Sequence, residues 1–378
     1  MAGYIFTLDS IDSLKEVAET GVYSTKFNNI PEKYWSTPHE GTFADYLSMK
    51  NGDNVYFFHK RKIYGIGKLV NIHNNCIFLN FPGADKPGTT SFDMIEDKMI
   101  LNESKEDLKK RFLCTFKGDP YLFKKGVDMD EVLSSTPHAF KMLRALWKLS
   151  FIKIDEIENK ALFDCVLKAN ESIVNGKSGC YQYDKKVHKR IKDIYTTNYL
   201  VTSKNIVKYA EENNSIKHEM AIEAAIIDYI SNNDSNNIYG TWDYISHQVI
   251  ASPFKPIDYM DKMDVFGYRY IKGYKTISKY LMIEIKKDAA NIETIDQAMK
   301  YIDWIEQEYS HDYNMIEAFI VASYISEEVV KKRDESAVRF YTKGRNPAET
   351  SQWKNLHLIE YRYNKKNNHI VFKEIAPI

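Results

Sequence analysis

The sequence predicts an α+β protein with more than one domain: a small β-barrel or curved sheet, a helical connector, and an α/β domain with a mixed sheet flanked by helices. At 378 residues, the chain exceeds the roughly 100–200 residues of a typical domain. Its hydrophobic periodicity changes from strand-like to helical near residue 128, and both patterns alternate after residue 216. We therefore expect domains at residues 1–125, 126–212 and 213–378.

The first 125 residues favour a small curved sheet or barrel. Short runs rich in aromatic and β-branched residues are separated by the turns Lys50–Asp53 and Pro82–Asp85, a pattern typical of short paired strands. Gly65 and Gly67 lie inside the third run and predict a β-bulge or a close approach between backbones. The expected strands are Tyr4–Thr7, Asn54–His59, Ile63–Ile72 and Asn75–Phe81.

Residues 126–212 change to helical spacing, with apolar residues at Ala139, Leu143 and Leu146. Basic side chains outnumber acidic ones between Tyr183 and His218. Either a solvated helix face or contacts to phosphates would account for that excess. We expect this segment to be a helical connector.

The C-terminal portion predicts the element order α-β-β-α-β. It begins with a helix over residues 216–231, and an amphipathic helix over residues 292–309 separates the second expected strand from the third. These elements predict a mixed sheet flanked by helices. The expected strands are Lys262–Tyr270, Lys279–Lys286, Glu317–Ile325, Leu356–Tyr363 and His369–Glu374.

Composition excludes several classes of protein. With 44% hydrophobic and 28% charged residues, the chain has the balance of an ordinary globular protein. No run approaches about 18 apolar residues and the N-terminus lacks a signal-peptide pattern, so we expect a cytoplasmic protein without membrane contact. The cysteines form no CxxC pair, which argues against a structural zinc site. The 52 basic and 52 acidic side chains balance, so binding of a polyanion must rest on local charge.

The strand expected at Lys279–Lys286 ends in charged residues. Side chains alternate along a strand, so Glu284 and Lys286 share one face while Ile285 lies on the other. Charges on an otherwise buried strand cost several kcal/mol in desolvation. A bound cation would offset this cost.

A second carboxylate is expected beside Glu284. Asp264 begins the apolar run of the preceding strand and would pair beside Glu284 across an antiparallel hairpin. Two carboxylates, the Ile285 carbonyl and water suit Mg²⁺ or Mn²⁺, which prefer oxygen ligands. Lys286 would then lie within reach of a metal-bound water and a scissile phosphate.

The helix before these strands offers a third carboxylate. Glu219 and Glu223 are four residues apart and therefore share a helix face. Glu223 is the favoured residue, because it interrupts the apolar stripe of the helix.

This constellation resembles the PD-(D/E)xK nuclease superfamily over about residues 215–325. The stretch Glu284-Ile-Lys-Lys, followed by Asp296-Gln-Ala-Met-Lys-Tyr-Ile, resembles the strand and helix of archaeal-type mismatch endonucleases, RecB-like nucleases and some antiphage defence nucleases. The resemblance implies metal binding by two carboxylates, a catalytic lysine and a supporting Gln/Tyr pair. The matching positions are Glu223, Asp264, Glu284, Ile285, Lys286, Gln297 and Tyr301.

The chain departs from the family pattern at the first carboxylate. No proline directly precedes Asp264, and Asp258 and Asp261 are therefore rival metal ligands. The alternative without chemistry is that the aspartate, glutamate and lysine form a surface ion pair at strand ends.

The N-terminal segment resembles a different group, the EVE, YTH and PUA-like domains, which bind nucleic acid. The resemblance lies in Tyr4–Ser10, Gly21–Phe27 and Gly52–Lys68. It implies a pocket for a modified base that is turned out of its stack, with Tyr23 and Trp35 as aromatic walls and Ser24 as a polar contact. Against this, aromatic residues at alternate strand positions are more often plain core.

We expect a metal-dependent DNA endonuclease with a modification-dependent restriction or phage-defence role. Its cofactor would be Mg²⁺ or Mn²⁺ and its partner DNA, modified or unmodified; a homodimer is an open alternative because many such enzymes that cut both strands dimerise. One rival hypothesis is a non-catalytic nucleic-acid-binding protein with a degenerate nuclease fold. Another is a nuclease gated by a small ligand or a partner.

Overall fold

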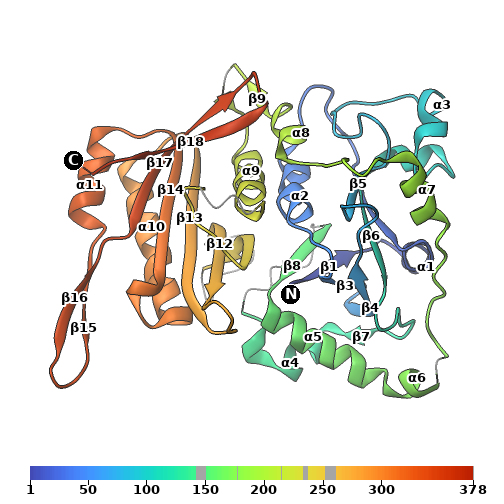
Figure 1. The fold of residues 1–378 in the computed structure, drawn as a ribbon, viewed down its shortest axis with the longest axis horizontal. Helices are drawn as coiled ribbons and strands as arrows, with labels where there is room; N and C mark the ends of the chain where they lie inside the picture. Colours follow the sequence, from blue (N-terminus) through green and yellow to red (C-terminus); the bar gives the residue numbers. More distant parts are fainter. Residues whose placement is uncertain (142–149, 177, 214, 233–236, 252–260, 378) are drawn as a thin grey trace. The chain divides into compact units, whose positions relative to one another are not determined.

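A computed structural model describes residues 1–378 apart from 142–149, 177, 214, 233–236, 252–260 and 378. The chain divides into two compact units, Met1–Tyr209 and Ala210–Ile378. Both units are mixed α+β, as predicted, and each has its own main sheet (Figure 1). Within the described ranges, no helix combines the length and the apolar character that a membrane span requires.

The main sheet of the first unit has the strand order β2-β6-β4-β3-β1-β8, with β5 beside β6 and β7 beside β4. The predicted irregularity is confirmed, because the register of β3 and β4 shifts between Val55 and Phe57. A Cβ atom on Gly67 would lie only 2.6 Å from the side-chain atom Val55 Cγ2 and 3.1 Å from the backbone oxygen of Lys117, so this position has no room for a side chain. The strands are β1 (Gly3–Thr7), β2 (Val22–Lys26), β3 (Asn54–His59), β4 (Lys62–Leu69), β5 (Ile77–Leu79), β6 (Lys110–Gly118), β7 (Val127–Asp128) and β8 (Phe151–Ile154).

The helices of the first unit carry clear start and stop signals. The backbone N–H of Ser13 donates to Ser10 Oγ at the start of α1, and Gly21 ends this helix with a left-handed φ of 66°. A capping box of Asp155 and Glu158 starts α5. The helices are α1 (Ile11–Thr20), α2 (Thr37–Leu47), α3 (Phe92–Ile95), α4 (Met129–Ser135), α5 (Glu156–Ala169), α6 (Glu171–Gly176), α7 (Lys186–Ile194) and α8 (Ser203–Val207).

Residues 126–209, which were expected to form most of a helical connector, belong to the first unit. Strand β7 pairs with β4, and strand β8 pairs with β1. The side chains of Phe151, Ile152 and Ile154 on β8 are all buried. A short apolar run that is buried on both faces has the same sequence pattern as a buried helix, which explains the difference.

The second unit contains all the elements predicted for it and several more, one of which is a further strand of its main sheet. Its main sheet has the order β11-β12-β13-β14-β17-β18, antiparallel at both edges and parallel from β13 to β17. The additional strand, β11, precedes β12, so the order is α-β-β-β-α-β. The strands are β11 (Tyr244–Ile250), β12 (Lys262–Tyr270), β13 (Ile277–Ala289), β14 (Ile316–Tyr324), β17 (Leu356–Asn364) and β18 (His369–Ile375).

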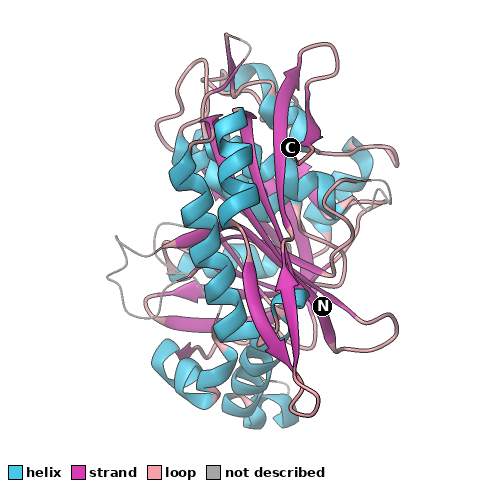
Figure 2. Cartoon of the chain, turned by 90° about the vertical axis from the view of Figure 1, so that its left-hand side faces the viewer, coloured by secondary structure: helices cyan, strands magenta, loops and turns pink. Residues whose placement is uncertain are grey.

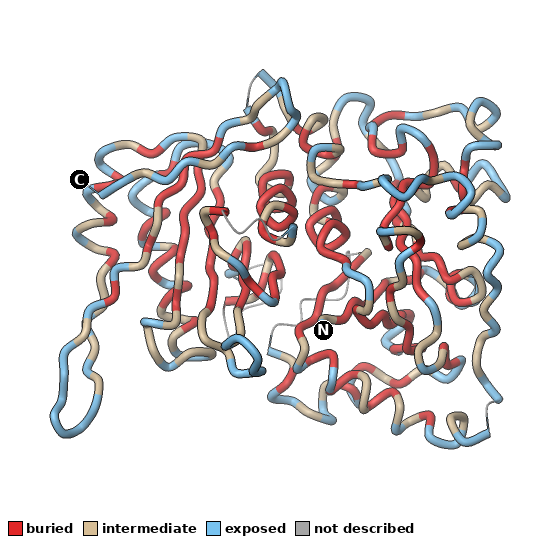
Figure 3. Tube along the Cα trace, in the orientation of Figure 1, coloured by how far each residue is buried: buried red, intermediate tan, exposed pale blue. Residues whose placement is uncertain are grey.

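Helices cover both sides of this sheet. Helix α9 (Glu219–Ser231) lies on one side, and α10 (Ile292–Ile305) and α11 (Glu327–Ser336) lie on the other (Figures 1 and 2). The central strands are consequently buried along most of their length (Figure 3). Strands β15 (Arg339–Lys343) and β16 (Glu349–Trp353) form a separate hairpin.

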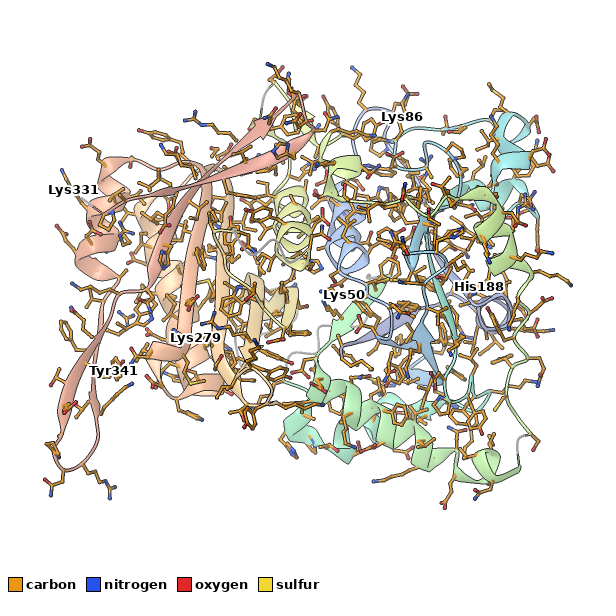
Figure 4. All side chains as sticks on the ribbon, viewed as in Figure 1. Lys50, Lys86, His188, Lys279, Lys331 and Tyr341 are labelled. Atoms are coloured by element: carbon orange, nitrogen blue, oxygen red, sulfur yellow. The ribbon has the colours of Figure 1, made fainter. Side chains whose placement is uncertain are left out.

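His188, labelled in Figure 4, ties α7 to the end of α1. Its Nε2 lies 2.8 Å from the carbonyl oxygen of Gly21, and its Nδ1 lies 2.6 Å from the hydroxyl of Tyr183. A neutral ring protonated at Nε2 satisfies both, because it donates to the carbonyl and accepts from the hydroxyl. Burial lowers the pKa of His188.

We expect the protein to lose stability as the pH falls below about 6.5, the ordinary pKa of histidine, because the unfolded chain takes up a proton that folded His188 resists. His188→Gln should weaken this dependence of the melting temperature between about pH 7.5 and pH 5. Burial also lowers the pKa values of His39 and His218. Both residues are present in the variant and in the unchanged protein, so they contribute equally to the two pH profiles. An identical pH dependence in the variant would contradict the role of His188.

Candidate functional site

The neighbouring strands β11, β12 and β13 bring the candidate residues of the second unit close together at one position along the sheet. The antiparallel register of β12 and β13 has Val265 paired with Ile283 as its last pair before Asp264 and Glu284. The register of β11 with β12 pairs His247 with Val265 and Val249 with Met263, so Gln248 lies between these pairs at the level of Asp264. Residues directly opposite in an antiparallel pair share a face of the sheet. Val265 and Ile283 thus share one face, and the alternation of side chains puts their neighbours Asp264 and Glu284 together on the other face.

A continuous set of hydrogen bonds joins α9 to the end of β13. Gln248 Nε2 donates to Glu223 Oε1 at 2.8 Å and to Asp264 Oδ1 at 3.1 Å. The backbone N–H of Ile285 donates to Asp264 Oδ2 at 2.7 Å. His247 Nδ1 lies 3.0 Å from Glu223 Oε2. Groups on β11 and β13 therefore fix the carboxylates of Glu223 and Asp264.

Glu284 is a buried carboxylate with one unsatisfied oxygen. Its side chain is only 1% exposed, and Lys286 Nζ donates to Oε1 at 2.6 Å. Oε2 has no hydrogen-bond partner among the residues that the structure describes. Leaving a buried acceptor unsatisfied costs free energy. This oxygen is therefore suited to binding a cation.

The electrostatics of the group favour the same conclusion. Burial raises the pKa of Asp264 well above its ordinary value, and the nearby charges of Glu284 and Glu223 add to the effect. Burial also raises the pKa of Glu284 to about 7, although Lys286 opposes this shift. For Lys286, burial acts to lower the pKa, but Glu284 and the other carboxylates outweigh it and raise the pKa. The group thus holds more negative charge than one ammonium stabilises.

Helix α10 contributes the predicted Gln/Tyr pair. Gln297 Nε2 donates to the hydroxyl of Tyr301 at 3.0 Å. Burial raises the pKa of Tyr301 to about 12, and the negative charges of Glu284 and Asp264 contribute. Tyr301 therefore lies within electrostatic reach of both carboxylates.

The other carboxylates weighed from the sequence have different positions. Glu219 Oε1 accepts a hydrogen bond from the backbone N–H of Lys287 at 3.1 Å, so Glu219 binds the backbone of β13 just after Lys286. Asp261 is exposed directly before β12. Asp258 lies outside the described residues.

The oxygen atoms at this site are of the type that binds a hard divalent cation. Asp264 and Glu284 provide carboxylate oxygens, which Mg²⁺ and Mn²⁺ prefer. Across the part of the chain that the structure describes, no three His, Cys, Asp or Glu side chains are already grouped as metal ligands. A cation here would therefore need backbone oxygens or water in addition to the two carboxylates.

The predicted base-binding residues of the first unit separate into two environments. Tyr23 and Ser24 line a cavity of about 300 Å³. The ring of Tyr23 is 4% exposed and stacks on Phe6 with centroids 4.4 Å apart, and its hydroxyl donates to the backbone oxygens of Thr7 and Ser150. Trp35 is fully buried and does not line this cavity.

Trp35 packs in the core of the first unit. Its ring lies 5.5 Å from both Phe27 and Phe43, centroid to centroid, in edge-to-face contacts. Arg111 adds a guanidinium 5.6 Å from the centroid of the Trp35 ring. The environment of Trp35 is that of a packed core residue.

Sequence reasoning missed His247 and Gln248. Both lie on β11, which was not predicted because the polar run Ser246–Gln248 interrupts its apolar residues. His247 is 1% exposed, and buried polar side chains need partners. The available signal was this polar run in the middle of an otherwise strand-like segment.

No protein-family model matches the chain, and no curated protein matches it. Among solved structures, one similar chain comes from the crystal structure of a repair endonuclease from Pyrococcus abyssi, with 21% sequence identity and a TM-score of 0.22. The match covers 34% of this chain and 47% of that chain, so this chain spans about half the length of the structure it matches. A likeness this weak assigns no function to this chain.

We expect Glu284→Gln to raise the stability of the metal-free protein by about 1–2 kcal/mol, because it removes a buried charge and replaces the unsatisfied oxygen by an amide. The measurement is the melting temperature in EDTA at about pH 7.5. Glu335→Gln, which changes an exposed glutamate of α11 in the same unit, is the control. A Glu284→Gln protein that melts below the unchanged protein would contradict the expectation.

Proposed function

We propose that the second unit is a metal-dependent nuclease domain of the PD-(D/E)xK type. The observation that carries this proposal is Oε2 of buried Glu284, which has no hydrogen-bond partner among the described residues and lies on the same sheet face as Asp264, beside Lys286. Asp264, Glu284 and the Ile285 carbonyl would hold Mg²⁺ or Mn²⁺, with water completing the shell. When bound, the cation would make a water molecule more acidic and neutralise charge that develops on a phosphate.

The side chains around these ligands have distinct proposed roles. Lys286 is 30% exposed and its raised pKa keeps it charged, so it can contact the scissile phosphate and orient the attacking water. Glu223 acts on Asp264 through Gln248. Gln297 holds the hydroxyl of Tyr301 near the carboxylates.

The proposed substrate is DNA, and the first unit is proposed to recognise it through a PUA-like domain. The cavity beside Tyr23 and Ser24 is of the size that holds a small ligand or one flipped base. Ser24, Lys26 and Asn28 line it with hydrogen-bonding groups. Recognition of a modified base would make the protein a modification-dependent restriction or phage-defence nuclease.

Purified protein should cleave DNA with Mg²⁺ or Mn²⁺ and should not cleave it in EDTA. Lys286→Ala should lower the cleavage rate by about 100-fold or more, because it removes a positive charge aimed at the phosphate. Substrates are unmodified plasmid and a panel carrying single base modifications. Lys287→Ala is the matched control, since this neighbouring lysine is half exposed and pairs loosely with Asp288.

The outcome also separates the rival functions. DNA binding without metal-dependent cleavage would overturn the nuclease proposal in favour of a binding protein with a degenerate site. Cleavage that starts only after a small molecule or a partner is added would favour the gated nuclease.

Ser24→Leu should weaken binding to the preferred modified DNA by about tenfold or more, because the larger side chain fills part of the cavity. Titration of labelled modified and unmodified oligonucleotides measures the effect. Ser134→Leu, on the exposed surface of α4, is the control. Equal loss for both kinds of oligonucleotide would show that the cavity does not read a modification.

A further inference from the structure

Gln248 joins the carboxylates of Glu223 and Asp264, and the inference about its role rests on the nuclease proposal. We propose that Gln248 is a positioning residue that holds Asp264 ready for a divalent cation. Glu223 would then serve as the anchor of Gln248 and not as a metal ligand.

The hydrogen bonds of Gln248 are divided evenly between its two partners. The amide nitrogen Nε2 has two N–H groups. One donates to Glu223 Oε1 at 2.8 Å and the other to Asp264 Oδ1 at 3.1 Å. Two buried carboxylates repel each other, and a neutral double donor between them keeps each one satisfied at a fixed separation.

Glu223 is in turn fixed from its other side. His247 Nδ1 lies 3.0 Å from Glu223 Oε2, so both oxygens of Glu223 are engaged. The side chains of Glu223 and His247 are 1% and 2% exposed, which leaves this pair little freedom to move. A carboxylate held at both oxygens on a buried helix is a firm support for Gln248.

Asp264, by contrast, keeps capacity for a cation. Among the described residues, Oδ1 of Asp264 accepts one hydrogen bond, from Gln248, and Oδ2 accepts one, from the backbone N–H of Ile285. A carboxylate offers about four lone-pair sites. In the part of the chain that the structure describes, two of these sites are therefore open, in an orientation set by the two donors.

The backbone of β11 is strained at this position. Gln248 has a φ of +52°, in the left-handed region that glycine and asparagine tolerate and other residues rarely adopt. Its neighbours His247 and Val249 keep their pairing with β12 on either side. A non-glycine residue in this conformation is held there by its surroundings, and here the two carboxylates hold its amide.

The test measures Mn²⁺ binding by isothermal titration calorimetry, independently of cleavage. Gln248→Gly removes the amide and relieves the backbone, and Gln248→Met keeps the chain length but cannot donate. Asn213→Gly is the matched control, because Asn213 also has a positive φ of 54° in the same unit but is exposed outside this group. Asp264→Asn identifies binding at the proposed site.

The expected result is a Mn²⁺ affinity about 10- to 100-fold weaker in both Gln248 variants, as is typical when a group behind a metal ligand is removed. Asn213→Gly should bind Mn²⁺ as the unchanged protein does. Affinities within about twofold of the unchanged protein in either Gln248 variant would overturn the role of Gln248 and leave the nuclease proposal standing. Failure of the unchanged protein to bind Mn²⁺ would overturn both.

Discussion

The second unit is organised around the buried carboxylate of Glu284 and the partly buried carboxylate of Asp264, with the ammonium of Lys286 beside them. Asp264 and Glu284 lie next to the Val265–Ile283 pair on β12 and β13, and Lys286 pairs with one oxygen of Glu284. The pKa values of both carboxyl groups are raised by burial and by neighbouring charge. Such an arrangement lowers the stability of the metal-free protein, so stability does not explain why it is present. A bound cation would explain it, because the cation would offset the negative charge.

The elements around these carboxylates hold Asp264 in position. Helix α9 and strand β11 supply Glu223, His247 and Gln248, which fix Asp264 from one side. The backbone of Ile285 fixes it from the other. The first unit has its own sheet, its own core around Trp35 and its own cavity, so the proposed recognition of a base is a separate property from the proposed cleavage.

Periodic segments were predictable from the sequence, and partners distant in the sequence were not. Strands β12, β13 and β14 and helix α10 have long apolar patterns, and the structure has them where the sequence predicts them. Strand β11 was missed because its central residues are polar, and two of them, His247 and Gln248, have their partner in Glu223, more than twenty residues earlier. Trp35 was expected to line a pocket, yet Phe27, Phe43 and Arg111 surround it in the core, which no local pattern reveals.

The most direct measurement is an anomalous difference map from crystals of the unchanged protein grown with Mn²⁺. The account predicts one strong peak between the carboxylates of Asp264 and Glu284, at about 2.1–2.3 Å from their oxygens. It also predicts that the Glu223 oxygens keep their contacts with His247 and Gln248 and do not approach the ion. A map without density at this position, or with Mn²⁺ held only elsewhere, would contradict the account.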